Sequence, residues 1–274
     1  MFKRPWLQIA PIALMFLLSL VGMVVFFPGC GSQPTPTQAP SGITATAGKG
    51  GSVRILVFSK TGGFRHASIK DGIAAITKLA DEHHITADFT EDASLFTDSN
   101  LAHYKAVVFL LTTGTNILNN DQKAAFERYI RAGGGYAGLH SATDTEYKWT
   151  WYGQLVGAYF KSHPSIQQAT IHVVDHNHPS TSMLPANWIR TDEWYNFATN
   201  PRSNVHVLMT MDESTYKGGI MGSDHPIAWY HEFDGGRAWY SALGHTSESY
   251  TEPLFVAHLW GGIAYAAGIQ TAQG

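Results

Sequence analysis

Short apolar runs alternate with amphipathic stretches through the first half of this 274-residue chain, and this alternation constrains the fold most strongly. Four runs are predicted to be strands that are buried on both faces: 53–59, 85–90, 106–111 and 136–139. Helices are predicted between them, over 68–82 and from Asn119 or Asn120 to Arg131. Strands and helices that alternate at this spacing predict an α/β fold, with a parallel sheet and helices on both of its faces.

The start of the first helix has a recognisable spacing. Ser68 is followed three residues later by Asp71, which resembles a capping box. In that motif the serine hydroxyl accepts a hydrogen bond from the backbone at the start of the helix, so Ser68 is predicted to cap it.

The second half of the chain is less regular and is predicted to be rich in strands. Its strand-like runs are 169–174, 205–211, 227–233 and 237–243. Asp234-Gly235-Gly236 separates the last two and predicts a hairpin turn. Residues 254–267 are apolar on most sides and predict a buried closing helix. We therefore predict one domain over 52–270, with a long insertion after the fourth strand.

Residues 1–30 resemble a targeting segment, because two basic residues precede an apolar run over 9–27 and a lone cysteine, Cys30. The pattern resembles a bacterial lipoprotein signal with Cys30 as the lipidated residue, although Phe27-Pro28 departs from the usual lipobox. The run is also long enough to span a bilayer, so a retained helical anchor is the alternative. Either anchor predicts an extracytoplasmic domain that is tethered to the membrane.

Composition narrows the function further. Residues 31–51 are rich in Ser, Pro, Thr, Gly and Ala and predict a flexible tether. Cys30 is the only cysteine, so the domain after it has no disulfide and no thiol. The formal net charge of -3 provides no basic field for nucleic acid. The sequence does not indicate the oligomeric state.

The run Tyr136–Ala142 predicts a strand that ends in a sharp turn, with His140 at its tip. This geometry presents one side chain at the end of an α/β sheet, where most enzymes that use it have Ser or Cys. Ligands bind at the carboxyl ends of such strands, and the loops with His66, Thr112-Thr113 and His140 all fall there. The site is therefore predicted to work without the usual nucleophile.

Histidines and carboxylates supply the candidate chemistry. His66, His140 and His245 fall at predicted strand ends, with Glu193 as the first carboxylate candidate and Asp144 as the second. Neutral imidazoles with a carboxylate suit Zn²⁺ or a similar divalent metal. We predict His66, His140 and His245 as metal ligands, and His140, Glu193, His245 and Asp144 as catalytic residues. The alternative is that each histidine only forms hydrogen bonds in the cleft or the core.

Four residues are predicted to bind substrate. Arg65 is expected to clamp a substrate oxygen, with a buried ion pair as the alternative. Trp194, Tyr195 and Trp229 are expected to stack on a sugar ring, with core packing as the alternative.

Other polar clusters are predicted to be structural. Asp175–Pro179 is expected to form a turn, and His258 is expected to be a hydrogen-bonded core histidine. His163 and His225 are expected to start loops, with His225 near the cleft. The glycines of 133–135 precede a strand, whereas a dinucleotide fingerprint follows one, so no nucleotide cofactor is expected.

Five short motifs follow one another along the domain: Gly63–His66, Gly138–Ser141, Asp192–Tyr195, Pro226–Trp229 and Leu243–His245. Together they resemble the ThuA-like (trehalose-utilisation) family over residues 52–268. The resemblance implies a flavodoxin-like fold of the class I glutamine amidotransferase type. In that fold the nucleophilic cysteine stands where this chain has His140, and the amidotransferase His and Glu correspond to His245 and Glu248.

The resemblance also implies a substrate class. With no thiol in the domain, glutamine hydrolysis through a thioester is excluded. The family is associated with the catabolism of trehalose and related disaccharides, so a small-molecule sugar is the expected partner. The favoured hypothesis is an enzyme acting on a sugar or keto-glycoside by metal-assisted hydrolysis or isomerisation. The alternative is a non-catalytic sugar-binding lipoprotein.

Overall fold

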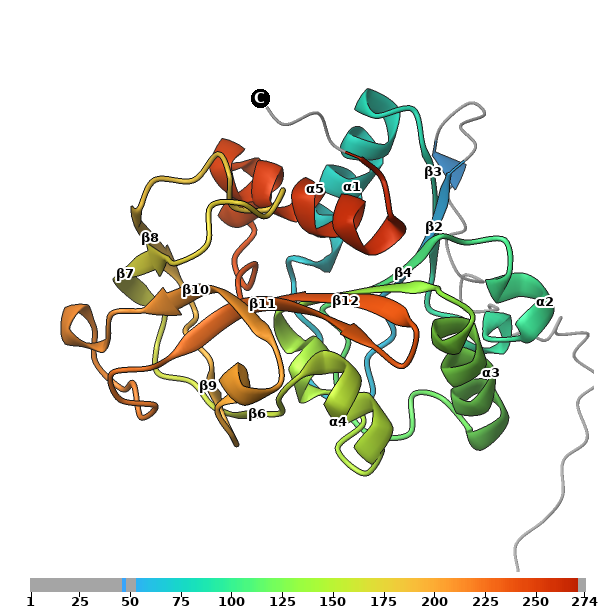
Figure 1. Cartoon of the computed structure of the whole chain (residues 1–274), viewed down its shortest axis with the longest axis horizontal. Coiled ribbons are helices and arrows are strands. Elements are labelled where there is room, and N and C mark those ends of the chain that lie inside the picture. Colours follow the sequence, from blue (N-terminus) through green and yellow to red (C-terminus); the bar gives the residue numbers. More distant parts are fainter. Residues whose placement is uncertain (1–45, 48–52, 271–274) are drawn as a thin grey trace, which may run out of the picture. The chain divides into compact units, whose positions relative to one another are not determined.

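A ten-stranded sheet runs through the domain in the order β1-β3-β2-β4-β5-β12-β11-β10-β7-β8 (Figure 1). The computed structural model describes residues 46–47 and 53–270 of the chain. The predicted targeting segment with Cys30 lies outside the described residues, as does most of the predicted tether. Within that tether, β1 (Thr46–Ala47) pairs antiparallel with β3. None of the helices in the described part is both long and apolar enough to span a bilayer.

The four strands predicted in the first half form the parallel part of the sheet. They are β2 (Arg54–Phe58), β3 (Thr86–Thr90), β4 (Ala106–Leu110) and β5 (Gly135–Leu139). Every residue of β3, β4 and β5 is buried, as expected for strands with helices on both faces. The chain returns after the insertion as β12 (Gly236–Ser241), which pairs parallel with β5.

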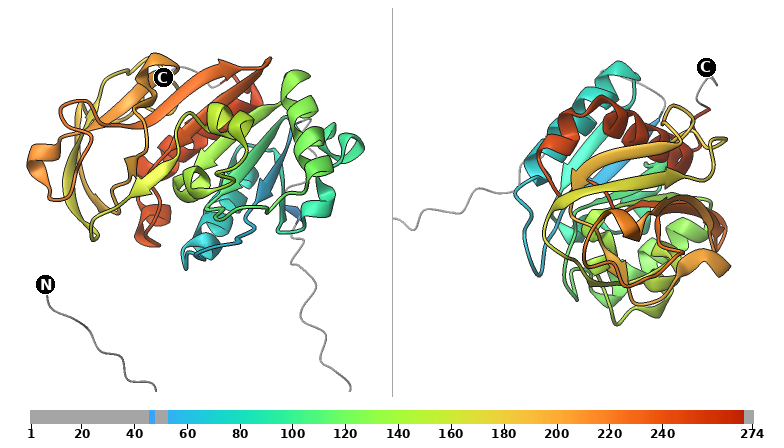
Figure 2. Two further views of the ribbon diagram at one scale, coloured as in Figure 1. Left: turned by 90° about the horizontal axis from the view of Figure 1, so that it is seen from below. Right: turned by 90° about the vertical axis from the view of Figure 1, so that its left-hand side faces the viewer.

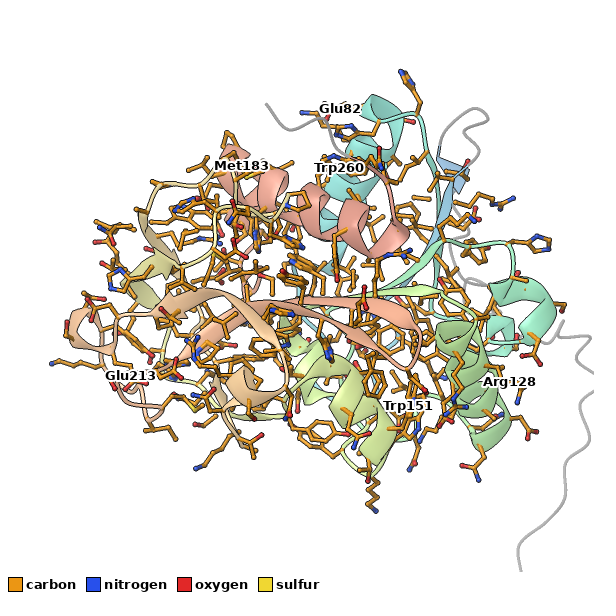
Figure 3. The ribbon with its side chains drawn as sticks, in the orientation of Figure 1. Glu82, Arg128, Trp151, Met183, Glu213 and Trp260 are labelled. Atoms are coloured by element: carbon orange, nitrogen blue, oxygen red, sulfur yellow. The ribbon has the colours of Figure 1, made fainter. Side chains whose placement is uncertain are left out.

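Two layers of helices cover the sheet (Figures 1 and 2). One face carries α1 (Ile69–Glu82) and α5 (Pro253–Ala267), and the other carries α3 (Asn120–Arg131) and α4 (Thr150–Val156), with the short α2 (Asp98–Leu101) beside α3. Figure 3 shows the same division in the side chains, with Glu82 and Trp260 on the first face and Arg128 and Trp151 on the second. The predicted α/β fold with helices on both faces is confirmed.

The helix caps show how local sequence and tertiary structure compete. Asn119 caps α3 as predicted, and its side chain and that of Gln122 exchange hydrogen bonds with each other's backbone. The capping box predicted for Ser68 is wrong, because the Ser68 side chain makes no cap hydrogen bond to α1. The Ser68 hydroxyl instead donates to the carbonyl of His245 at 2.7 Å. The serine is used to hold a distant loop.

The insertion builds the antiparallel part of the sheet. Its strands are β7 (Gln167–Val173), β8 (Asn187–Asp192), β10 (His206–Met211) and β11 (Pro226–Phe233), and a separate small sheet pairs β6 (Phe160–Ser162) with β9 (Asn196–Phe197). Asp234 and Gly235 both have positive φ, 49° and 94°, and join β11 to β12 in the predicted hairpin. The sequence did not predict α4, β6, β8 or β9.

Short 3₁₀ helices complete the described chain. They are η1 (Ala93–Leu95), η2 (His140–Asp144), η3 (Pro201–Ser203), η4 (Glu213–Thr215) and η5 (Glu248–Thr251). Two of them flank the polar cluster described below, since η2 begins at His140 and η5 begins shortly after His245.

Candidate metal centre

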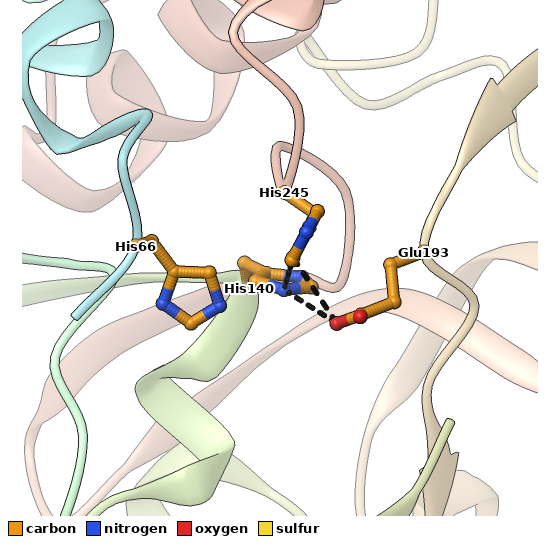
Figure 4. Close-up of side chains that lie close together, drawn as sticks. All are labelled: His66, His140, Glu193 and His245. Atoms are coloured by element: carbon orange, nitrogen blue, oxygen red, sulfur yellow. Dashed lines mark hydrogen bonds and ion pairs between the residues drawn. The ribbon is translucent and has the colours of Figure 1, made fainter. Parts of the chain in front are cut away.

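Four side chains that are distant in sequence converge at one end of the parallel strands. One nitrogen or oxygen atom from each of His66, His140, Glu193 and His245 lies within 4.8 Å of the others (Figure 4). His66 follows β2, His140 directly follows β5, Glu193 follows β8 and His245 follows β12. Three of them are buried and His245 is half-buried. The three histidines of the sequence analysis and its first carboxylate therefore share one site.

Three atoms of this cluster form a tight triangle. His140 Nε2 is 3.3 Å from Glu193 Oε2 and 3.2 Å from His245 Nδ1. His245 Nδ1 is 3.1 Å from the same Glu193 oxygen. The backbone of His140 has a φ of 48°, an unusual left-handed value for a residue with a Cβ, which is consistent with the predicted sharp turn.

Sheet register fixes the orientation of the His140 ring. Leu139 of β5 is paired with Ser241 of β12, so the next residues, His140 and Ala242, also lie side by side. The Nδ1–H of His140 donates to the carbonyl of Ala242 at 2.7 Å. A carbonyl only accepts hydrogen bonds, so in the neutral ring the lone pair is on Nε2 and faces the cluster. This arrangement is typical of a metal-binding histidine.

The triangle then contains too few protons for its contacts. With the lone pair of His140 on Nε2, the only ring proton available within the triangle is on His245 Nδ1, and it lies between two acceptors. His140 Nε2 and Glu193 Oε2, which lie 3.3 Å apart, are therefore two electron-rich atoms that repel each other. A cation, either a second proton or a metal ion, removes this repulsion.

The environment sets the charges of the site. Burial, followed by the neighbouring His140 and His245, lowers the pKa of His66 to about 3, so this imidazole is neutral at pH 7. Burial alone would raise the pKa of Glu193, but the adjoining imidazoles of His140 and His245 outweigh it and hold that pKa well below its usual range. Burial alone would lower the pKa of His245, but the ion pair with Glu193 raises it.

The donor set fits a divalent metal. Ligand atoms about 2.0–2.1 Å from a tetrahedral Zn²⁺ are about 3.3 Å from one another. The three sides of the triangle are 3.1, 3.2 and 3.3 Å. His66 supplies a neutral nitrogen close by, and its ring meets those of His140 and His245 edge-on at 4.9 and 5.1 Å. Three imidazoles and one carboxylate are borderline ligands that suit Zn²⁺.

His163 also contacts the cluster, although the sequence indicated only a loop start there. Its Nδ1 lies 2.9 Å from Glu193 Oε1 and also 2.9 Å from the carbonyl of Pro164. Its Nδ1–H donates to the carbonyl of Pro164, and the same nitrogen lies beside the Glu193 oxygen that is not part of the triangle. No motif spacing distinguishes His163 from an ordinary loop histidine; the preceding strand, β6, brings it to the site.

Exposed aromatic residues beside the cluster were also missed. Phe64 is 66% exposed, and its ring meets that of His66 edge-on at 4.9 Å. Tyr147 is 40% exposed, and its hydroxyl donates to Asp144 Oδ1. Asp144, the second carboxylate candidate, shares η2 with His140 but is not part of the four-residue cluster. Its burial raises its pKa, although the hydrogen bond from Tyr147 opposes this.

Two of the predicted substrate-stacking residues lie in the core. Trp229 is fully buried, and its indole N–H donates to the carbonyl of Val156. Trp194 is buried as well, and its indole donates to the carbonyl of Gln167. Neither ring has an exposed face for a sugar, so the core-packing alternative holds for both. Tyr195 is also buried, but its ring centre lies 4.1 Å from that of His140.

Arg65 lies at the surface. Its guanidinium makes two hydrogen bonds to the carboxylate of Glu91, at 2.6 and 3.1 Å, and both side chains are about half exposed. The alternative of a buried ion pair is therefore wrong, since this pair is exposed to solvent.

The pairing of His245 with Glu248, implied by the amidotransferase resemblance, is also wrong. His245 pairs with Glu193, whereas Glu248 is exposed at the start of η5. The carboxylate partner comes from the insertion, and not from the segment that follows the histidine.

The remaining polar clusters are structural. His258 is buried between the carbonyl of Ser180 and the hydroxyl of Ser241, as predicted for a core histidine. The backbone N–H of Asn177 donates to the side chain of Asp175, which forms the predicted turn. His225 is buried and binds the carbonyl of Tyr195, so it holds the segment that carries Glu193.

Comparison with known proteins supports a family assignment. The sequence model of the ThuA family, described as trehalose utilisation, matches residues 54–266 of this chain. None of the curated proteins matches it.

Solved structures of similar fold include two bacterial ThuA-like proteins. A putative ThuA-like protein from Bacteroides uniformis is 24% identical, with a TM-score of 0.68 over 83% of this chain and 95% of that one. One from Parabacteroides merdae is 19% identical, with a TM-score of 0.66 over 82% and 93%. A β-galactosidase from Bacillus circulans is 13% identical, with a TM-score of 0.53, over 80% of this chain and 32% of its own. The predicted flavodoxin-like fold of the glutamine amidotransferase type is confirmed.

Proposed function

This chain belongs to the ThuA (trehalose utilisation) family, which supports a role in sugar catabolism, and we propose that it is a metal-dependent enzyme acting on a small sugar or keto-glycoside. The proposal depends on one observation. His140, His245 and Glu193 hold three ligand-type atoms at 3.1–3.3 Å from one another, in a buried site with a neutral His66 beside them.

Each residue of the site has a definite task in this proposal. His66, His140, His245 and Glu193 would hold the divalent cation, which when bound polarises a sugar carbonyl or hydroxyl. The carbonyl of Ala242 orients the His140 ring, and His163 lies 2.9 Å from the second oxygen of Glu193. These outer contacts keep the ligands in their binding tautomer and orientation.

Proton transfer is assigned to Asp144. It shares η2 with His140, and burial raises its pKa toward the range in which a carboxyl group both gives and takes protons. The hydroxyl of Tyr147 donates to it and fixes its orientation. The exposed ring of Phe64, beside His66, is proposed to cover one face of the sugar. Whether the bond change is hydrolysis or isomerisation is decided by product analysis.

The experiment measures bound metal and turnover on the same preparations. The purified chain is analysed for divalent metals and incubated with 3-keto-disaccharides, with and without a chelator. We expect bound metal and a product that disappears with the chelator. His140→Ala should lose both properties, whereas His103→Ala, an exposed histidine elsewhere on the domain, should keep both.

The alternative function gives a different result in the same assay. A non-catalytic sugar-binding protein would bind the disaccharide without forming product, and a chelator would leave the binding unchanged. Absence of metal from the wild-type protein together with chelator-resistant turnover would refute the metal-dependent mechanism.

We further propose that the domain is extracytoplasmic and tethered to the membrane by residues 1–30. Support comes from the basic residues, the apolar run and the lone Cys30 of that segment. Cell fractionation of wild type and Cys30→Ser tests this. Loss of membrane attachment in the variant indicates a lipid anchor, retention indicates a helical anchor, and a cytoplasmic wild-type protein would refute the proposal.

A further inference from the structure

Asp192, the last residue of β8, binds the backbone of two candidate ligands at once. It is fully buried and immediately precedes Glu193. Its Oδ1 accepts the backbone N–H of Glu193 at 2.9 Å and that of His245 at 3.2 Å. Its Oδ2 accepts the N–H of Gly244 at 2.9 Å. One carboxylate therefore joins the insertion to the loop after β12.

The same carboxylate closes a buried charge network. The hydroxyl of Ser249 donates to Oδ2 at 3.3 Å, and the guanidinium of Arg190 lies 3.4 Å from that oxygen. Arg190 is buried as well and has Glu252 as a second partner at 3.1 Å. Asp192 thus receives donors from its own strand, from the His245 loop and from η5.

The loop that carries His245 is held by hydrogen bonds on both sides of that residue. Residues 242–247 belong to no helix or strand, and Gly244 has a φ of 102°. On the carbonyl side, the Ser68 hydroxyl donates to His245. On the amide side, Gly244 and His245 both donate to Asp192. These bonds fix the backbone of His245 on both its carbonyl and its amide side.

We propose that Asp192 is a positioning residue that sets the distance between His245 and Glu193 and so prepares the site for a metal ion. The inference rests on the proposed function, since it concerns the same site. A carboxylate is required, because every group that faces Asp192 is a donor. In either orientation, the NH₂ group of an asparagine would point at one or more of these donors.

The test compares Asp192→Asn with Glu252→Gln. Both variants remove a negative charge next to Arg190, but only Asp192 bonds the amides of Gly244 and His245. Hydrogen exchange is measured on metal-free protein, and Zn²⁺ affinity is measured by titration with the metal alone. We expect Asp192→Asn to speed exchange of the Gly244 and His245 amides at least about tenfold and to weaken Zn²⁺ binding about 10–100-fold. Glu252→Gln should leave both quantities near wild type.

Three results would overturn the proposal. One is unchanged exchange and affinity in Asp192→Asn, and another is an equal change in both variants, which would assign the effect to the charge of Arg190. The third is rapid exchange of the Gly244 and His245 amides in the wild-type protein. This measurement needs no variant, so it tests the proposal even when Asp192→Asn does not fold. A wild-type protein that binds no Zn²⁺ would refute a zinc-dependent function, while the exchange data would still test the positioning role.

Discussion

The parallel and antiparallel parts of the sheet bury their residues in different ways. β3, β4 and β5 are buried along their whole length, because helices cover both faces. In β8 every second residue is exposed, and β7 follows a similar alternation. The strands of the parallel part are therefore recognisable in the sequence as apolar runs. Strand β8 is not recognisable in this way, because polar Arg190 and Asp192 lie on its buried side.

The two parts also contribute differently to the site. His66 and His140 stand at the ends of parallel strands, where the topology alone places them together. Glu193 and His163 come from the insertion, where no sequence rule places them. The parallel strands therefore carry the three candidate imidazole ligands, whereas the insertion carries the carboxylate ligand and His163 beside it. The predictions below test whether the two parts depend on each other.

The largest expected effect concerns the shared core. Phe109→Ala in the parallel part and Trp229→Ala in the antiparallel part each remove a fully buried ring. Each should lower the free energy of unfolding by about 3–5 kcal/mol. Denaturation followed by both fluorescence and circular dichroism should show one transition in each variant. Ile220→Ala, at a side chain that is 55% exposed, is the control and should change stability by less than about 0.5 kcal/mol. Separate unfolding of the insertion would show that the two parts of the sheet do not share one cooperative core.

The second prediction compares ligands from the two parts. His140→Ala and Glu193→Gln should each weaken Zn²⁺ binding by more than about 100-fold, because losing a ligand costs more than losing an outer contact. Calorimetric titration measures this, and the matched control His103→Ala should bind like wild type. A large effect at His140 with none at Glu193 would show that the insertion does not supply a ligand.

The third prediction uses pH. Burial lowers the pKa of His258 to about 3, and an unfolded histidine titrates near 6.5. Between about pH 6.5 and 3, His258 therefore binds a proton in the unfolded state but not in the folded state. The free energy of unfolding falls as the pH is lowered through this range. The slope from this residue is about 1.4 kcal/mol per pH unit. Urea denaturation at several pH values measures it, and His258→Gln should reduce the slope. An identical slope in the variant would contradict the assignment.

The smallest effect is expected at Arg65. Its ion pair with Glu91 is exposed, so Arg65→Ala should cost at most about 1 kcal/mol of stability. We expect kcat/KM on a keto-disaccharide to change less than about twofold, which corresponds to a change of about 0.4 kcal/mol in transition-state stabilisation. A rise in KM of tenfold or more would instead assign Arg65 to substrate binding, as the sequence suggested.

Prediction from sequence succeeded where local pattern and topology suffice. The apolar runs of β2 to β5, the Asn119 cap and the Asp234-Gly235 turn follow from burial and backbone geometry within a few residues. It failed where a side chain had a distant partner. Ser68 matched a helix cap but binds the His245 loop, and Trp229 sat in a motif but fills the core.

The amino-acid pattern alone determined that the chain forms an α/β sheet and that His66 and His140 follow strands of it. It also determined that the domain has no thiol. Each of these conclusions follows from nearby residues or from composition. Only the folded chain decided that Glu193, and not Glu248, faces His245, and that His163 and Asp192 support the cluster. These contacts join residues about 30 to 53 positions apart in sequence, and they arise from strand pairing and loop packing that no local periodicity encodes.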